Sequence, residues 1–213
     1  MSLSEIITIL VMFQLSHYRT FKDLYKDCLS IYYASEFPRL VSYNRFVELM
    51  KHAVVPLMIM LNSLSGSKTG KYYIDSTKLE VCHNMRISRH KVFKDIAKRG
   101  KTSTGLFFGF KLHIIMNDRG EIINISITPG NKDDRAVVEN LARNLKGWLF
   151  GDRGYIGKSI AEKLRVQGLE LITRIKKNMK AKLYSEAQKS FLNKRNFIET
   201  AIGQLKNICH ILH

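Results

Sequence analysis

The first 62 residues carry their apolar positions at helical spacing. Three runs show this pattern, at residues 2–15, 21–33 and 42–61. Ser2 and Glu5 stand in the spacing of a capping box at the start of the first run. We expect the third run to bend or end near Pro56, because proline interrupts a helix. The pattern predicts a small all-helical unit, for which a helix-turn-helix and plain helix packing both remain open.

From residue 71 the pattern becomes typical of strands. Aromatic and β-branched side chains dominate residues 71–82. Residues 106–118 and 121–128 are two further strand-like runs, and the Asn-Asp-Arg-Gly sequence at 117–120 predicts a hairpin between them. Residues 84–105 form a basic excursion that we expect to be partly helical.

The rest of the chain alternates between helix and strand. We expect helices at 133–146, 158–168 and 191–208, a strand that ends at Phe150, and a strand at 169–177. Three strands followed by this alternation imply parallel pairing of the later strands. The order is ribonuclease H-like, an α/β fold with a mixed sheet flanked by helices. We place this domain at residues 71–213, after the helical unit at 1–62 and a Ser/Gly-rich linker at 63–70.

The charge of the chain indicates a polyanionic partner. The net charge is +17, and residues 71–213 hold 28 Lys/Arg against 13 Asp/Glu. Such an excess favours nucleic acid first and an anionic membrane second. The longest apolar runs, residues 6–13 and 53–61, are shorter than a membrane span, and three scattered cysteines are typical of a reducing interior. We therefore expect a cytoplasmic, nucleoid-associated protein with no membrane partner.

Three carboxylates are candidates for a catalytic site. Asp75 lies mid-strand, where an aspartate is unfavourable unless something requires it, and Asp152 ends a later strand between glycines. In the ribonuclease H-like order these two strands are neighbours, so both carboxylates would converge at one edge. Glu199, in the final helix, is the third candidate. The alternative is that each acid is an isolated turn, N-cap or surface residue, but the three together in this order favour a site.

The final helix has two distinct sides. Arg195, Glu199 and Lys206 fall within about 40° of one another around its axis. A separate apolar stripe is expected to pack on the sheet and consists of Phe197, Ala201, Leu205 and Ile208. Glu199 would then lie on the edge beside the buried side, between two bases.

Phosphodiester cleavage would use this combination of residues. In-line displacement uses two metal ions that hold the attacking and leaving oxygens, and Mg²⁺ prefers carboxylate oxygens, water and substrate phosphate. Asp75, Asp152 and Glu199 are therefore candidate ligands for Mg²⁺ (or Mn²⁺), and Arg195 and Lys206 are candidates to hold DNA by its phosphates.

The motifs YYIDST, FGDRGY and RNFIETAIGQLK resemble those of bacterial DDE insertion-sequence transposases, most closely the insertion sequence 982 family. Many such enzymes have the pattern Tyr, two residues, Arg, three residues, Glu, six residues, Lys. Arg195, Glu199 and Lys206 match that spacing, and Leu192 stands where the Tyr would be. The resemblance implies Asp75, Asp152 and Glu199 as catalytic residues.

The same resemblance implies DNA transposition, with transposon ends and target DNA as partners and a homodimer as the active form. Members of the family usually continue beyond both ends of this chain, so we expect a truncated copy. Two other functions remain open. One is a nuclease of the same fold without strand transfer, and the other is a non-catalytic DNA-binding fragment.

A second basic region could contact DNA. Residues 86–101 carry seven bases and one acid; the bases are Arg86, Arg89, Lys91, Lys94, Lys98, Arg99 and Lys101. We expect phosphate contacts from this region, with a solvated surface as the alternative. Asp133 and Asp134 are expected to cap a helix.

Overall fold

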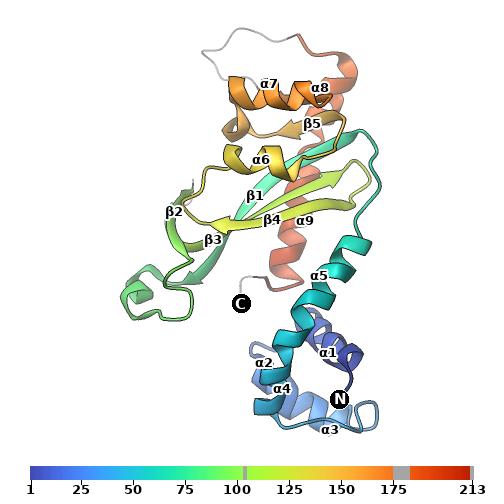
Figure 1. Ribbon diagram of the computed structural model, residues 1–213, viewed down its shortest axis with the longest axis vertical. Coiled ribbons are helices and arrows are strands. Elements are labelled where there is room, and N and C mark those ends of the chain that lie inside the picture. Colours follow the sequence, from blue (N-terminus) through green and yellow to red (C-terminus); the bar gives the residue numbers. More distant parts are fainter. Residues whose placement is uncertain (103–104, 175–182, 212–213) are drawn as a thin grey trace. The chain divides into compact units, whose positions relative to one another are not determined.

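The computed structural model describes residues 1–102, 105–174 and 183–211. The chain divides into two compact units, each with its own core (Figure 1). The first contains Met1–Leu64 together with Gln204–Ile211, and the second contains Ser65–Gly203.

The first unit is built from short helices around an apolar core. Its elements are α1 (Leu3–Leu15), α2 (Phe21–Asp23), the π-helix η1 (Leu24–Leu29), α3 (Ser30–Tyr32), α4 (Tyr43–Met50), the 3-10 helix η2 (Lys51–Ala53) and α5 (Val54–Ser63). The predicted capping box at Ser2 and Glu5 is confirmed. Ile9, Leu29 and Phe46 are fully buried in the core of this unit, as the apolar helical pattern requires.

Pro56 does not end the third helical run. It lies in the first turn of α5, and the backbone tightens into η2 just before it. A proline N–H is missing there, so the carbonyl four residues earlier lacks its helical donor, which accounts for the local 3-10 turn. By length and composition alone, the helical stretch Tyr43–Ser63 could cross a membrane.

The second unit is a mixed sheet with helices on both faces. Its strands are β1 (Lys71–Cys82), β2 (Lys98–Thr102), β3 (Gly105–Asn117), β4 (Ile122–Pro129), β5 (Gly147–Gly151) and β6 (Leu169–Thr173). Its helices are η3 (Asn84–Arg89, 3-10), α6 (Arg135–Leu141), η4 (Arg153–Tyr155, 3-10), α7 (Lys158–Val166), α8 (Glu186–Asn193) and, as far as Gly203, α9 (Asn196–Asn207).

The strand order is β2-β3-β1-β5-β6, and β4 also pairs with β3. The pairs of β3 with β1, β2 and β4 are antiparallel, whereas β1–β5 and β5–β6 are parallel. This is the predicted ribonuclease H-like order. The strands that carry Asp75 and precede Asp152 are direct neighbours, with Tyr73 opposite Phe150, so that prediction is confirmed.

A contact between two glycines sets the start of this strand pair. Gly70 and Gly147 both have positive φ, and the N–H of Trp148 donates to the carbonyl of Gly70. A Cβ on Gly147 would meet the Gly70 carbonyl oxygen at 2.1 Å. Only glycine allows this approach, which places β1 and β5 in a fixed register.

Alternate residues of β1 face the two sides of the sheet. Tyr72 and Ile74 pack into the core that α6 and α7 cover, together with Leu149. Tyr73 faces the other side, where its ring contacts Phe150. Figure 1 shows α6 in front of the sheet and α9 behind it. Asp75 shares the face of Tyr73.

Two elements differ from the sequence prediction. The basic excursion contains a strand, β2, which pairs with β3 along its whole length. Its KRGKT sequence has no apolar pattern, so the strand depends on backbone pairing rather than on its own side chains. The helix predicted at 191–208 is two helices, with a break at Lys194 and Arg195 between α8 and α9. Residues 175–177 of the last predicted strand lie outside the described residues.

Candidate active site

Asp75 lies in β1 on the face opposite Tyr72 and Ile74, with its side chain 20% exposed. Its Oδ1 accepts a hydrogen bond of 2.9 Å from the N–H of Ser76. The pKa of this carboxyl is raised to about 6, mainly by burial. The Ser76 N–H and Arg195 lower it, and the charges of Asp152 and Glu199 add to the rise. Asp75 therefore lies within the electrostatic reach of both other predicted carboxylates.

Asp152 directly follows β5 and begins η4. Its Oδ1 accepts a hydrogen bond of 2.7 Å from the N–H of Gly154, which is the ordinary turn role of an aspartate. The side chain also lines a pocket of about 300 Å³, whose other lining residues are Gly151, Arg153, Arg174 and Arg195. The turn role does not exclude a role in the site, because the Gly154 N–H occupies Oδ1 of Asp152 and the carboxylate has a second oxygen, Oδ2.

Arg195 pairs with two of the predicted carboxylates, Asp75 and Glu199. It forms an ion pair with Glu199 one turn along the chain, and its Nη1 lies 4.0 Å from Oδ2 of Asp75. The side chain is 16% exposed, and Nη1 is buried without a hydrogen-bond partner. A buried guanidinium nitrogen without a hydrogen-bond partner is costly, and the nearby charge of Asp75 offsets part of that cost.

The apolar stripe predicted for the final helix is wrong. Ile198 and Ile202 are the buried residues of α9, at 0% and 6% exposure, whereas Phe197 is 44% exposed. Residues 198 and 202 are four apart and share one helix face, and Arg195 and Glu199 border that face. Burial of Ile198 and Ile202 therefore sets the rotation of the helix that places Arg195 beside Asp75 of β1. Ile208 is also exposed.

The donor set fits a hard divalent cation in its chemistry. All three predicted ligands are carboxylates, which Mg²⁺ and Mn²⁺ prefer. Among the residues that the structure describes, no three His, Cys, Asp or Glu side chains are already grouped closely enough to hold a metal ion. The Arg195 guanidinium pairs with Asp75 and Glu199 instead. To bind a metal ion, the Glu199 carboxylate would therefore have to leave its ion pair with Arg195.

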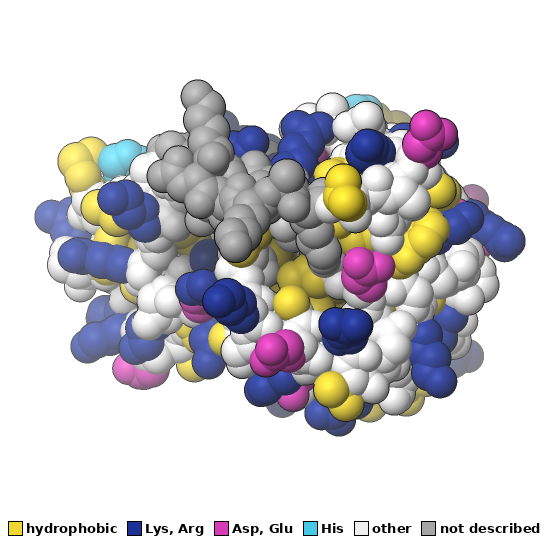
Figure 2. Space-filling view, turned by 90° about the horizontal axis from the view of Figure 1, so that it is seen from above, with side chains coloured by type: hydrophobic (Ala, Val, Ile, Leu, Met, Phe, Trp, Pro, Cys, Tyr) yellow, Lys and Arg dark blue, Asp and Glu magenta, His cyan; other side chains and the backbone are white. Residues whose placement is uncertain are grey.

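The predicted DNA contacts at residues 86–99 lie apart from Asp75. Arg86 and Arg89 are on η3 and Lys98 and Arg99 are on β2, all exposed, as is Lys91 between them. These elements join the end of β1 near Cys82, roughly 20 Å from Asp75 along the strand. Lys206 is in the last turn of α9 and groups with the first unit. Lys and Arg side chains are spread over the face seen in Figure 2.

Two pocket residues were missed in the sequence. Arg153 follows Asp152 directly within the FGDRGY motif. Arg174 follows β6, whose last residue Thr173 pairs with Gly151 of β5. Residues after the carboxyl ends of neighbouring parallel strands meet at one edge of the sheet. That rule, applied to β6 as well as to β5, would have found Arg174.

Residues 65–213 match the family model of the transposase DDE domain. The chain belongs to this family. The predicted resemblance to DDE transposases is thereby confirmed at the level of the family, and the matched residues include all three candidate carboxylates of the transposase domain.

The fold of the transposase domain is also found among solved structures. The piggyBac transposase synaptic complex with hairpin DNA has a TM-score of 0.58 and 12% sequence identity to this chain. The likeness covers 97% of this chain and 59% of that chain, so the chain spans about three fifths of the length of the solved transposase. At this identity the likeness shows the fold alone.

A second solved structure is more distant. A simian T-cell lymphotropic virus intasome in complex with PP2A regulatory subunit B56 gamma has a TM-score of 0.29 and 13% identity, over 77% of this chain and 58% of that chain. A value this low does not indicate a shared fold. No curated protein matches the chain.

Proposed function

We propose that this chain contains the catalytic domain of a transposase that cleaves DNA strands at the ends of a mobile element and transfers them to a target. The main support is that Arg195 pairs with both Asp75 and Glu199 and lines one pocket with Asp152, inside a domain of the transposase DDE family. We propose further that the element is a bacterial insertion sequence of the 982 type, and that the protein acts in the cytoplasm on the nucleoid.

Asp75, Asp152 and Glu199 are the residues that would hold Mg²⁺ or Mn²⁺. When bound, the metal supplies stabilisation of charge on the attacking and leaving oxygens of the phosphodiester. Asp75 must give up its proton to become a ligand, and its pKa of about 6 leaves it charged at neutral pH. Glu199 is 50% exposed, so its carboxylate is open to solvent on one side.

The arginines of the pocket are suited to bind the DNA strand. Arg153, Arg174 and Arg195 line the same pocket as Asp152. Arg195 is paired with Asp75 and Glu199, so Arg153 and Arg174 supply the positive charge beside Asp152 where a phosphate would enter. Guanidinium groups bind phosphate oxygens in pairs and hold a strand in register without reading its sequence.

The proposal includes two partners, DNA and a second copy of the chain. The piggyBac transposase is described in a synaptic complex with hairpin DNA, and we extend DNA binding, to element ends and to target, to this chain. The exposed bases of η3 and β2 would contact phosphates away from the cleavage site. We propose a homodimer as the active form, residues 1–62 as a separate helical unit, 63–70 as a linker and 71–213 as the catalytic domain.

Nicking of supercoiled plasmid with Mg²⁺ or Mn²⁺ tests the cleavage step. The wild-type chain is expected to nick DNA, and Asp75→Asn and Glu199→Gln are expected to abolish nicking while both variants keep their circular dichroism spectrum. Equal nicking by the wild type and both variants would exclude these residues from the chemistry.

One observation favours a second candidate function. Arg195 pairs with two of the three carboxylates, which is also what a non-catalytic DNA-binding domain would show if its acids served only to hold an arginine. Titration with Mn²⁺ separates the two. A chain that binds DNA but takes up no Mn²⁺ is a binding domain, and one that binds both supports the transposase. A product without joined strands would identify a nuclease without strand transfer.

A further inference from the structure

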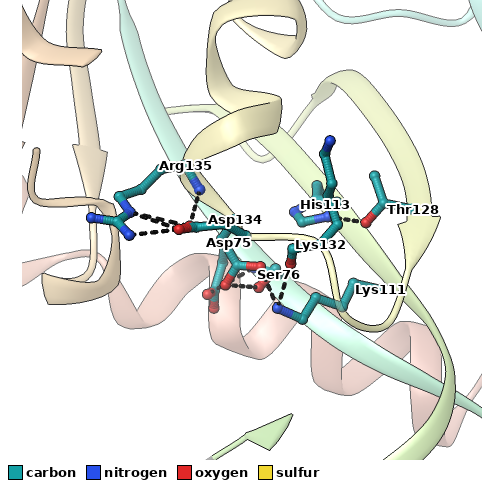
Figure 3. A network of polar contacts seen from close by, with 9 residues as sticks. Asp75, Ser76, Lys111, His113, Thr128, Lys132, Asp134 and Arg135 are labelled. Atoms are coloured by element: carbon teal, nitrogen blue, oxygen red, sulfur yellow. Dashed lines mark hydrogen bonds and ion pairs between the residues drawn. The ribbon is translucent and has the colours of Figure 1, made fainter. Parts of the chain in front are cut away.

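A network of polar contacts lies behind Asp75, on the opposite face of β1 (Figure 3). The Oγ of Ser76 donates a hydrogen bond of 3.1 Å to Oδ2 of Asp134. Lys111, from β3, donates through Nζ to Oδ1 of Asp134 at 2.8 Å and to the carbonyl of Lys132 at 3.0 Å. One carboxylate thus ties together β1, β3 and the segment that leads into α6.

Asp134 makes these contacts instead of capping helix α6, which was its expected role. It is the N-cap residue of α6, but its side chain makes no capping hydrogen bond, which corrects the sequence prediction. Asp133 instead accepts the N–H of Arg135 at 2.9 Å and pairs with the Arg135 guanidinium. An N-cap aspartate normally accepts a backbone N–H of its own helix. The carboxylate of Asp134 is therefore used across the sheet rather than in its helix.

The network is partly buried. The side chains of Lys111 and Asp134 are 13% and 28% exposed. Tyr155 is buried beside this network, and its pKa is raised by burial and then by the charge of Asp134, against the lowering effect of the Ser76 hydroxyl. A partly buried ion pair that also accepts a hydroxyl hydrogen bond holds its members in a defined geometry. Loss of Asp134 would leave Lys111 charged and without its carboxylate partner.

Ser76 connects this network to the candidate site. Its Oγ is held by Asp134, and its N–H donates to Oδ1 of Asp75. The two bonds leave adjacent residues of one strand in opposite directions, because successive side chains alternate across a sheet. A shift of Ser76 therefore moves both the backbone that carries Asp75 and the donor that orients its carboxylate.

We infer that Asp134 and Lys111 are positioning residues that set the geometry of Asp75 through Ser76. This inference rests on the proposed function, in which Asp75 is a metal ligand. Outer partners of metal ligands orient the ligand, and their loss typically weakens metal binding about 10–100-fold. The arrangement matches that role, since the partners contact Ser76 and do not enter the site.

Mn²⁺ binding to the full 213-residue chain, followed by the electron paramagnetic resonance of free Mn²⁺, tests the inference. Asp134→Ala is expected to weaken Mn²⁺ binding about tenfold, the lower end of the range for an outer partner. Asp133→Ala is the matched control, because this neighbouring aspartate pairs with Arg135 and, within the described residues, makes no hydrogen bond to Ser76 or Lys111, and it is expected to bind Mn²⁺ like the wild type. Ser76→Ala removes one hydroxyl, leaves the ion pair intact and should weaken binding in the same direction.

Amide hydrogen exchange at Ser76 supplies a second readout that needs no metal. Exchange is expected to be faster in Asp134→Ala and unchanged in Asp133→Ala. Asp134→Ala with lowered stability but wild-type Mn²⁺ affinity would overturn the inference and leave Asp134 a structural residue. If the wild type binds no Mn²⁺, the proposed function fails. Exchange at Ser76 then decides alone, with faster exchange in Asp134→Ala supporting the positioning role and equal exchange overturning it.

Discussion

Arg195, directly before α9, pairs with Glu199 one helical turn away, and its Nη1 lies 4.0 Å from Oδ2 of Asp75 on β1. A positive side chain thus occupies the space between two of the three carboxylates of the candidate site. The relationship has consequences for protonation, for metal binding and for the orientation of the helix.

Removal of Arg195 should raise the pKa of Asp75 above its value of about 6, because the guanidinium is one of the groups that lower it. Arg195→Gln tests this, with the titration of the Asp75 carboxyl followed by NMR. Arg165→Gln is a control, since Arg165 lies on α7 and is exposed. An unchanged or lower pKa in Arg195→Gln would show that the guanidinium does not act on Asp75.

Asp75→Asn should stabilise the fold at neutral pH in the absence of metal. The pKa of Asp75 is raised in the folded state, so the folded chain binds more protons than the unfolded chain between about pH 4 and pH 6, and stability falls as pH rises through that window. Asn cannot ionise, so the variant keeps the free energy of unfolding that the wild type loses when Asp75 becomes charged. This difference is about 3 kcal/mol on the scale of 1.36 kcal/mol per pKa unit. Urea unfolding at pH 4 and pH 8 measures it. A gain of equal size at both values would point to a cause other than the charge.

Asp152 should show two separable roles. Asp152→Asn keeps an oxygen for the N–H of Gly154, so folding and DNA binding are expected to remain near wild type while metal-dependent cleavage is lost. Asp152→Ala should lose cleavage and also about 1 kcal/mol of stability, as for other lost caps. Thermal unfolding and plasmid nicking are measured on both variants. Full cleavage by the Asn variant, or a large loss of its stability, would reduce Asp152 to a turn residue.

Truncation of the buried face of α9 should destabilise the domain far more than truncation of its exposed face. Ile198→Ala and Ile202→Ala are each expected to cost about 2–5 kcal/mol, the usual range for a buried aliphatic side chain. Phe197→Ala, at a half-exposed position of the same helix, should cost distinctly less despite its larger side chain. Chemical denaturation of the three variants compares them. A larger cost at Phe197 would contradict the helix orientation.

DNA binding by the basic region should be visible in its salt dependence. Replacement of Arg86, Arg89 and Lys91 by Gln should lower the slope of log affinity against log salt by about 0.9 for each phosphate of duplex DNA that is no longer neutralised. Three exposed bases of α7, Lys158, Lys163 and Arg165, provide a control with the same change in charge. Equal slopes for both triple variants would show that Arg86, Arg89 and Lys91 do not contact DNA phosphates.

The sequence was sufficient for the relations that follow from local pattern and element order. Asp75 and Asp152 could be placed on neighbouring strands because the strand order of the fold determines which strands pair. The rotation of α9 was harder, because both candidate stripes of the helix contain apolar residues and only the sheet selects between them. Ile198 and Ile202 were missed for this reason.

The network behind β1 lay beyond sequence reasoning. Ser76 and Asp134 are 58 residues apart, and nothing local distinguishes Asp134 from Asp133 as the one that leaves its helix. β2 was missed because its sequence has the composition of a solvated loop. In both cases the local structure depends on a partner that is distant in the chain, and a single sequence does not indicate which residues are in contact.

The contact between Gly70 and Gly147 has a consequence for how this gene can change. It fixes where β1 begins, and Asp75 stands five residues after Gly70. Within a strand, one inserted or deleted codon exchanges the two faces. A length change of one residue between Gly70 and Asp75 would turn the carboxylate into the core beneath α6 and bring Ser76 to the face of the candidate site. We therefore expect the length of this short stretch to be inherited unchanged, even where the residues within it vary.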